Sequence, residues 1–103
     1  MGTEITEEIY SKEAKELAKL AKAISHPARI SILKILLKKD CICKDIVEEL
    51  PLAQSTVSQH LKALKKADLI IGDIDPPKVC YRLNHEKWKQ ASQLLNSWFL
   101  TCC

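Results

Sequence analysis

The hydrophobic repeat of this chain changes from a helical period to a strand period just after residue 67. Within residues 54–67, apolar side chains recur every three or four residues, and nearly all of the remaining positions are polar or small. The segments 69–71 and 79–83 then carry short β-type runs, with Asp75-Pro76-Pro77 between them. We therefore expect a helix with one narrow apolar stripe, followed at once by a β-hairpin whose turn covers residues 72–78.

Helical patterns fill most of the remaining chain. They cover residues 6–24, 27–38, 44–50 and 85–100, with Pro27 at the start of the second helix and Asn84 as the cap of the last. Only two Gly and four Pro are present among 103 residues, which disfavours an all-β fold with many tight turns. The expected fold is mainly α with a small hairpin, in the order α-α-α-α-β-β-α, as a single domain over residues 1–103.

Several classes of protein are disfavoured by what the sequence lacks. No apolar run approaches the length of about 20 residues that a membrane span requires, and no secretory signal pattern opens the chain. We therefore expect a cytoplasmic protein without a membrane partner. The sequence also suggests no nucleophile–base pair and no glycine-rich phosphate loop, so an enzyme is not expected.

Residues 44–67 have the pattern of a helix-turn-helix. Its second helix must bury one side and present the other to a DNA major groove, where short polar side chains near the N-terminus reach base edges. A plain amphipathic surface helix would show the same stripe, but a hairpin in the position of a wing favours DNA binding. The candidate DNA-binding residues are Gln54, Ser55, Thr56, Ser58, Gln59, His60, Lys62 and, in the hairpin, Lys78.

Four segments of this chain, residues 26–33, 41–46, 54–64 and 79–83, together resemble the ArsR/SmtB family of bacterial winged helix-turn-helix repressors. The most specific part is the run Ser-Thr-Val-Ser-Gln-His-Leu-Lys-Ala-Leu at residues 55–64. The resemblance implies double-stranded operator DNA as a partner, and release of that DNA when a metal or metalloid binds.

The resemblance also implies a homodimer built on the helices at about residues 6–24 and 85–100. A chain of 103 residues has too little core to cover both terminal helices on all their apolar sides, although an intramolecular core is the alternative. The expected interface residues are Ile9, Leu17, Leu20, Trp88, Leu95, Trp98 and Phe99.

The sequence departs from the family pattern in the turn and in the wing. Ala67-Asp68 stands where the family commonly has a glycine. If Asp68 takes the left-handed conformation there, it costs about 1 kcal/mol relative to Gly. Asp73 and Asp75 place acids near the hairpin tip, where they would repel phosphate and weaken the wing's contribution to DNA affinity.

The candidate inducer ligands are cysteines. Cys41 and Cys43 lie where the family's arsenic and heavy-metal sensors carry a Cys-x-Cys element, although Lys44 shifts the register and a third cysteine of that helix is absent. A thiol near a helix N-terminus ionises more readily and then suits a soft metal. Cys102 and Cys103 could complete the site or form a functionless tail. Cys80 is expected to pack in its strand and is a less favoured ligand.

Few ligands, all of them sulfur, favour As(III) or Sb(III) as the inducer. Cadmium or lead, and a disulfide switch involving Cys41 or Cys43, remain alternatives within the same class. A metal-sequestering protein that binds no specific DNA is the alternative from another class. His85 and Glu86 begin the last helix and no second histidine follows, so the family's histidine–carboxylate zinc site is not expected.

Overall fold

The computed structural model describes residues 9–39, 50–75 and 78–101. Within these ranges the elements are α2 (Lys12–Ala23), α3 (Pro27–Lys38), α5 (Gln54–Lys66), β1 (Ile70–Asp75), β2 (Lys78–Leu83) and α6 (His85–Leu100). The expected fold class, mainly helical with one antiparallel hairpin, is confirmed. The helix expected at residues 44–50 lies almost wholly outside the described ranges.

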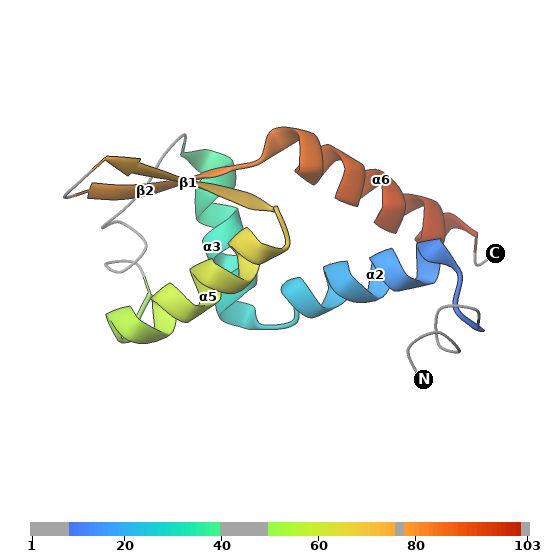
Figure 1. Ribbon diagram of the computed structural model, residues 1–103, viewed down its shortest axis with the longest axis horizontal. Helices are drawn as coiled ribbons and strands as arrows, with labels where there is room; N and C mark the ends of the chain where they lie inside the picture. Colours follow the sequence, from blue (N-terminus) through green and yellow to red (C-terminus); the bar gives the residue numbers. More distant parts are fainter. Residues whose placement is uncertain (1–8, 40–49, 76–77, 102–103) are drawn as a thin grey trace.

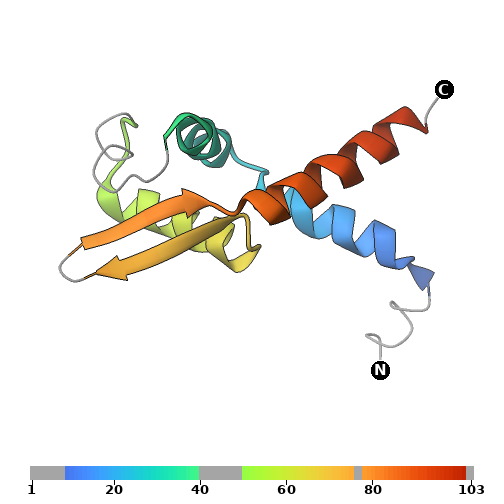
Figure 2. The ribbon, with the colours of Figure 1, turned by 90° about the horizontal axis from the view of Figure 1, so that it is seen from above.

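The described elements form a body with two kinds of projection. Helices α3 and α5 pack against each other and against the hairpin. The hairpin extends from one end of this body, while α2 and α6 contact each other and extend from the other end (Figures 1 and 2). None of the described helices is long and apolar enough to cross a membrane.

Helix α3 is the central element of the core, as its broad apolar surface predicts. Its buried side chains meet the buried stripe of α5 and the base of the hairpin. The fully buried large side chains are Ile32, Val57, Leu64, Leu69, Ile70 and Leu83. No polar or charged side chain is buried among the described residues, so packing of aliphatic groups holds the body together.

Three helices begin at side-chain caps. His26 Nδ1 accepts a hydrogen bond of 3.0 Å from the Ala28 amide at the start of α3, and Asn84 caps α6 as expected. The single helix expected over residues 6–24 is interrupted: residue 9 is helical, but a separate helix, α2, begins at Lys12, and residues 6–8 lie outside the described ranges. Ser11 Oγ accepts a 3.0 Å hydrogen bond from the Ala14 amide, so its side chain caps a new helix instead of continuing an earlier one.

The connection from α5 to β1 is a tight C-terminal cap. Asp68 has φ = 63°, which confirms the left-handed conformation expected there. Its amide donates to the Lys65 carbonyl at 2.9 Å, and the Leu69 amide donates to the Leu64 carbonyl at 3.1 Å, the pair of bonds that defines a Schellman motif. Leu64 and Leu69 are both buried, so the motif fixes the hairpin to the end of α5.

The hairpin is longer than the sequence pattern suggested. The strands pair from Ile70 opposite Leu83 to Asp75 opposite Lys78, so most of the expected 72–78 turn is paired strand. Backbone hydrogen bonds hold such a ladder whatever the side chains are, which hides its length from a hydrophobicity pattern. At Gly72, a Cβ atom would lie 3.3 Å from Cε1 of Tyr81 on the opposite strand, so glycine leaves room for this ring.

Candidate nucleic-acid interface

Helix α5 divides sharply into a buried and an exposed face. Val57, Leu61 and Leu64 are buried against α3 and β1, in the register that the sequence predicted. The opposite face is polar and points to solvent. It carries the exposed residues Gln54, Ser55, Ser58, Gln59 and Lys62, with Thr56 partly exposed beside them. This face is free to meet a large ligand without unfolding the body.

The charge distribution along α5 suits an anionic ligand. Its N-cap residue, Ala53, provides no side-chain hydrogen bond, and the first turn contains no acidic residue. The Thr56 amide already donates to the Ala53 carbonyl at 3.0 Å, but the positive end of the helix dipole still favours an anion such as phosphate near this N-terminus. Lys65 and Lys66 lie in the last turn, where they also offset the negative end of the helix dipole.

His60 lies on α5 but is directed towards the start of α3. Its Nδ1 accepts a hydrogen bond from Nε of Arg29 at 3.2 Å, and its ring centroid lies 4.4 Å from that of His26. Partial burial, and then the charges of His26 and Arg29, lower the pKa of His60 below its usual 6.5. Arg29 was not among the expected site residues, although it lies in the His-Pro-Ala-Arg segment that the family resemblance covers.

The predicted wing residue, Lys78, occupies the first position of β2, opposite Asp75. This end of the hairpin points away from α2 and α6 and lies on the side of the molecule where α5 begins (Figure 1). Arg82, which was not among the expected DNA-binding residues, is a further basic residue of the hairpin and is exposed. Its alternation with Tyr81 and Leu83 places it on the outer face of β2.

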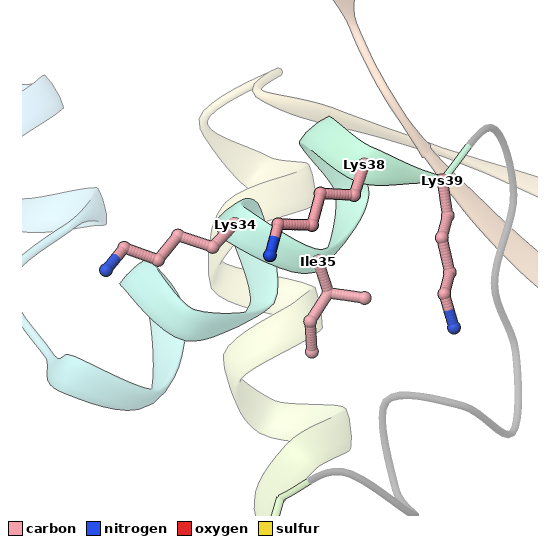
Figure 3. Close-up of a pocket in the computed structure, with 4 residues that line it drawn as sticks. All are labelled: Lys34, Ile35, Lys38 and Lys39. Atoms are coloured by element: carbon pink, nitrogen blue, oxygen red, sulfur yellow. The ribbon is translucent and has the colours of Figure 1, made fainter.

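A small hollow of about 170 Å³ lies on the C-terminal part of α3. Its described lining consists of Lys34, Ile35, Lys38 and Lys39 (Figure 3). The described lining is basic, which disfavours a cationic inducer at this hollow. The part of the chain that the structure describes also contains no cluster of three or more His, Cys, Asp or Glu residues able to hold a metal ion.

Four of the five predicted sulfur ligands, Cys41, Cys43, Cys102 and Cys103, lie outside the described residues. The fifth, Cys80, lies partly buried in the middle of β2, opposite Asp73. Its sulfur is in a disulfide bond. The sequence suggested a disulfide at Cys41 or Cys43 only as an alternative, and packing was the favoured role for Cys80.

The residues expected at a dimer interface fall into two groups. Leu17, Leu20, Trp88 and Leu95 are partly buried, and Leu20 and Trp88 pack against the core. Ile9, Trp98 and Phe99 are exposed, and the last two rings contact each other with centroids 5.2 Å apart. The outer ends of α2 and α6 both lie on the side of the molecule away from the hairpin (Figure 2).

Comparison with known proteins places this geometry in a family. The sequence-family model described as bacterial regulatory protein, arsR family, matches residues 26–71 of this chain. The arsenical resistance operon repressor of Staphylococcus xylosus is 35% identical over 82 residues, which cover 80% of this chain and 79% of that protein. This chain belongs to the ArsR family. The resemblance noted in the sequence is therefore confirmed.

Other relatives of this ArsR-family chain differ in what their names describe. The biofilm growth-associated repressor of Xylella fastidiosa is 28% identical over 99 residues, covering 96% of this chain and 84% of that protein. The crystal structure of the repressor BigR from Xylella fastidiosa has a TM-score of 0.67 and 28% identity, covering 89% of this chain and 91% of that one. Reduced HlyU from Vibrio cholerae has a TM-score of 0.66 and 25% identity, covering 89% and 95%. These relatives support a DNA-binding regulator, whereas their names indicate no single inducer.

Proposed function

We propose that this ArsR-family protein is a homodimeric repressor that binds operator DNA through α5 and leaves it when its cysteines bind As(III) or Sb(III). The observation that carries the DNA-binding part is the exposed polar face of α5 above a fully buried stripe. A helix anchored in this way can enter a major groove as a rigid body. The hairpin beside it is held at a fixed angle by the cap at Asp68.

We assign separate roles to the residues of the exposed face. Gln54, Ser55, Thr56, Ser58 and Gln59 lie in the N-terminal half of α5, the part of a recognition helix that reaches base edges. Their side chains can donate and accept hydrogen bonds, which is what direct readout needs. Lys62 on α5 and Lys78 in the wing would meet phosphates.

The proposed dimer is supported by exposed apolar side chains at the end of α6 and just before α2. Ile9, Trp98 and Phe99 are large side chains that a monomer leaves in water, and aromatic side chains are enriched at protein interfaces. A twofold dimer would place two copies of α5 on successive major grooves, about 34 Å apart. Each half-site alone would bind weakly, so the dimer would be needed for operator affinity.

The proposed inducer rests on the chemistry of the donor set. Cys41 and Cys43 would supply two thiolates, and Cys102 or Cys103 a third sulfur, a set that suits a three-coordinate thiophilic ion. The names of the staphylococcal relatives, arsenical resistance operon repressors, support the same ion class. To release DNA, the ion needs to bind the DNA-free state better than the DNA-bound state by a few kcal/mol.

The DNA-binding part is tested by changing α5 in place. Ser55→Ala/Gln59→Ala should lower affinity for the inverted repeat that the protein selects from a randomised duplex library, by about 1–3 kcal/mol per lost base contact. Affinity for unrelated duplex should change little. A matched control is Gln93→Ala/Ser97→Ala, which removes the same two side chains at the same spacing from the exposed face of α6. Equal operator affinity of the two variants would refute the assignment of α5.

The inducer is tested by a mobility-shift assay with and without arsenite under reducing conditions. Cys41→Ser and Cys43→Ser should bind the operator normally but stay bound when arsenite is added. Cys102→Ser/Cys103→Ser should respond weakly if the tail supplies the third sulfur, while Cys80→Ser should respond almost as wild type. Release of a Cys41→Ser/Cys43→Ser protein by arsenite would refute the site. Arsenite binding without any specific DNA binding would instead indicate a sequestering protein.

A second candidate, a thiol–disulfide switch, is favoured by the disulfide at Cys80. Two thiols would lose two protons and two electrons to an oxidant such as hydrogen peroxide, which becomes water. If this is the signal, peroxide should change operator affinity in wild type and dithiothreitol should reverse it. Cys80→Ser should then lose the response to peroxide. In this case arsenite should leave the operator affinity of the wild-type protein unchanged. The same variant thus separates the two mechanisms. If arsenite is the inducer, Cys80→Ser should release the operator almost as wild type does, whereas if oxidation is the signal, this variant should not respond.

A further inference from the structure

Three side chains form a cluster where α2, α3 and α5 meet. Arg29 Nε donates to His60 Nδ1 at 3.2 Å, and Arg29 Nη1 donates to the main-chain carbonyls of Lys22 at 3.1 Å and Ala23 at 3.3 Å. His26 caps α3 and lies against the His60 ring. One guanidinium therefore connects the C-terminal end of α2 with the middle of α5.

These contacts define the protonation state of His60. Its Nδ1 accepts a hydrogen bond from a guanidinium, which cannot lose its own proton, so this nitrogen carries no hydrogen. The ring is then neutral, with its hydrogen on Nε2. Among described residues, His26 and Arg29 are the titratable or charged groups that face it. The positions one turn away in α5 are Thr56, Val57, Ala63 and Leu64, none of which carries charge.

We propose that Arg29 is a positioning residue that holds the recognition helix, through the neutral ring of His60, to the end of the helix α2 that joins the dimer. This inference rests on the proposed DNA-binding role of α5. The partly buried His60 then acts as a strut between helices and reads no base. The bond sets how α5 is presented relative to the dimer, and so the fit of two copies of α5 to two half-sites.

The lysine variant separates positioning from a phosphate contact. Arg29→Lys keeps the positive charge but cannot bond His60 and two carbonyls in the same planar fork. Operator affinity should fall about tenfold, the scale of one lost charge-assisted hydrogen bond, with no change in the dependence of affinity on salt. Arg29→Lys binding as wild type would overturn the proposal, because it would show that only charge is needed.

The partner residue provides a rescue test. His60→Leu removes the acceptor and should also lower affinity about tenfold, while His60→Asn places an amide oxygen near the position of Nδ1 and should recover most of that loss. The double variant Arg29→Lys/His60→Leu should lose little more operator affinity than either single variant, since both substitutions break the same bond between positions 29 and 60. Losses that multiply in the double variant would overturn the coupling.

The direction in which operator affinity changes with pH distinguishes the proposed hydrogen bond from a direct contact between His60 and DNA. Protonation of His60 breaks the bond to Arg29, so operator affinity of wild type, relative to His60→Asn, should fall as the pH drops below 6.5. A histidine that touched phosphate would bind more tightly when protonated, and the ratio would rise. His85→Asn, at the exposed start of α6, is the matched control and should keep the wild-type profile.

Two measurements distinguish failure of the positioning role of Arg29 and His60, called the strut here, from failure of the proposed repressor function. Wild type that selects no sequence from the randomised library would refute the repressor, and with it the role of the strut. If wild type selects a sequence but the Arg29 and His60 variants bind it equally well, only the strut is refuted. Nitrogen-15 NMR of the wild-type histidines at neutral pH needs no variant to fold, and a His60 ring with hydrogen on Nδ1 would overturn the proposal directly.

Discussion

Helices α5 and α6 are both amphipathic, but the rest of the protein buries their apolar faces to different extents. The stripe of α5 is entirely buried, with Leu64 at 0% exposure. In α6 only Ala91 is buried, while Trp98 is 47% and Phe99 62% exposed. Helix α5 therefore has only its polar face to offer a partner, whereas α6 also exposes large apolar side chains at its C-terminal end. A polar, basic-ended helix suits DNA, whereas an aromatic surface suits a second copy of the chain.

The largest effect expected from this comparison is loss of the proposed dimer. Trp98→Ala/Phe99→Ala removes two exposed aromatic side chains, and a twofold interface loses them from both copies. Dimerisation should weaken by about 4–8 kcal/mol, as measured by sedimentation equilibrium, and operator binding should weaken with it.

The exposed aliphatic residues of α3 provide the control for the dimer experiment. Ile30 and Leu37 are 44% and 51% exposed, much like Trp98, but lie on a helix not assigned to the interface. Ile30→Ala/Leu37→Ala should leave the dimer intact. Dissociation by this pair alone would move the interface from α6 to α3.

The next effect compares one leucine from each helix. Leu64→Ala creates a cavity in the core and should lower the free energy of unfolding by about 2–5 kcal/mol. Leu100→Ala, at a position 67% exposed, should have a much smaller effect on the unfolding of a monomer. Chemical denaturation at a protein concentration below that of dimer formation measures both. Similar losses would show that the end of α6 packs in the monomer as firmly as α5 does.

The smallest effect concerns the end of α5. Asp68→Gly should raise the free energy of unfolding by up to about 1 kcal/mol, because glycine adopts φ = 63° without the strain of a side chain. Ala67→Gly, one residue earlier at φ = −84°, should lower it, since glycine there only adds entropy to the unfolded chain. Thermal unfolding of the two variants decides the point. A lower melting temperature for Asp68→Gly would reveal another role for its carboxylate.

The order of elements and most helix ends could be predicted because they depend on residues near one another in the chain. Pro27 at the start of α3, Asn84 as the cap of α6 and the left-handed Asp68 each act over a few residues. The single helix expected over residues 6–24 was wrong in its continuity, because the apolar stripe continues through the helical residue Ile9 whereas the Ser11 cap begins a separate helix, α2, at Lys12. Strand length was also misjudged, since pairing across the hairpin depends on the opposite strand.

The sequence by itself determined that this chain has a helix with one narrow apolar stripe joined to a hairpin, and which residues of that helix face outward. Periodicity alone decides this, since the burial of Val57 and Leu61 turns Ser55 and Gln59 away from the core. Only the tertiary structure decided that His60 faces Arg29, 31 positions earlier, and that Arg29 also reaches the end of α2. Such contacts depend on how helices cross in three dimensions, and no local repeat encodes a crossing.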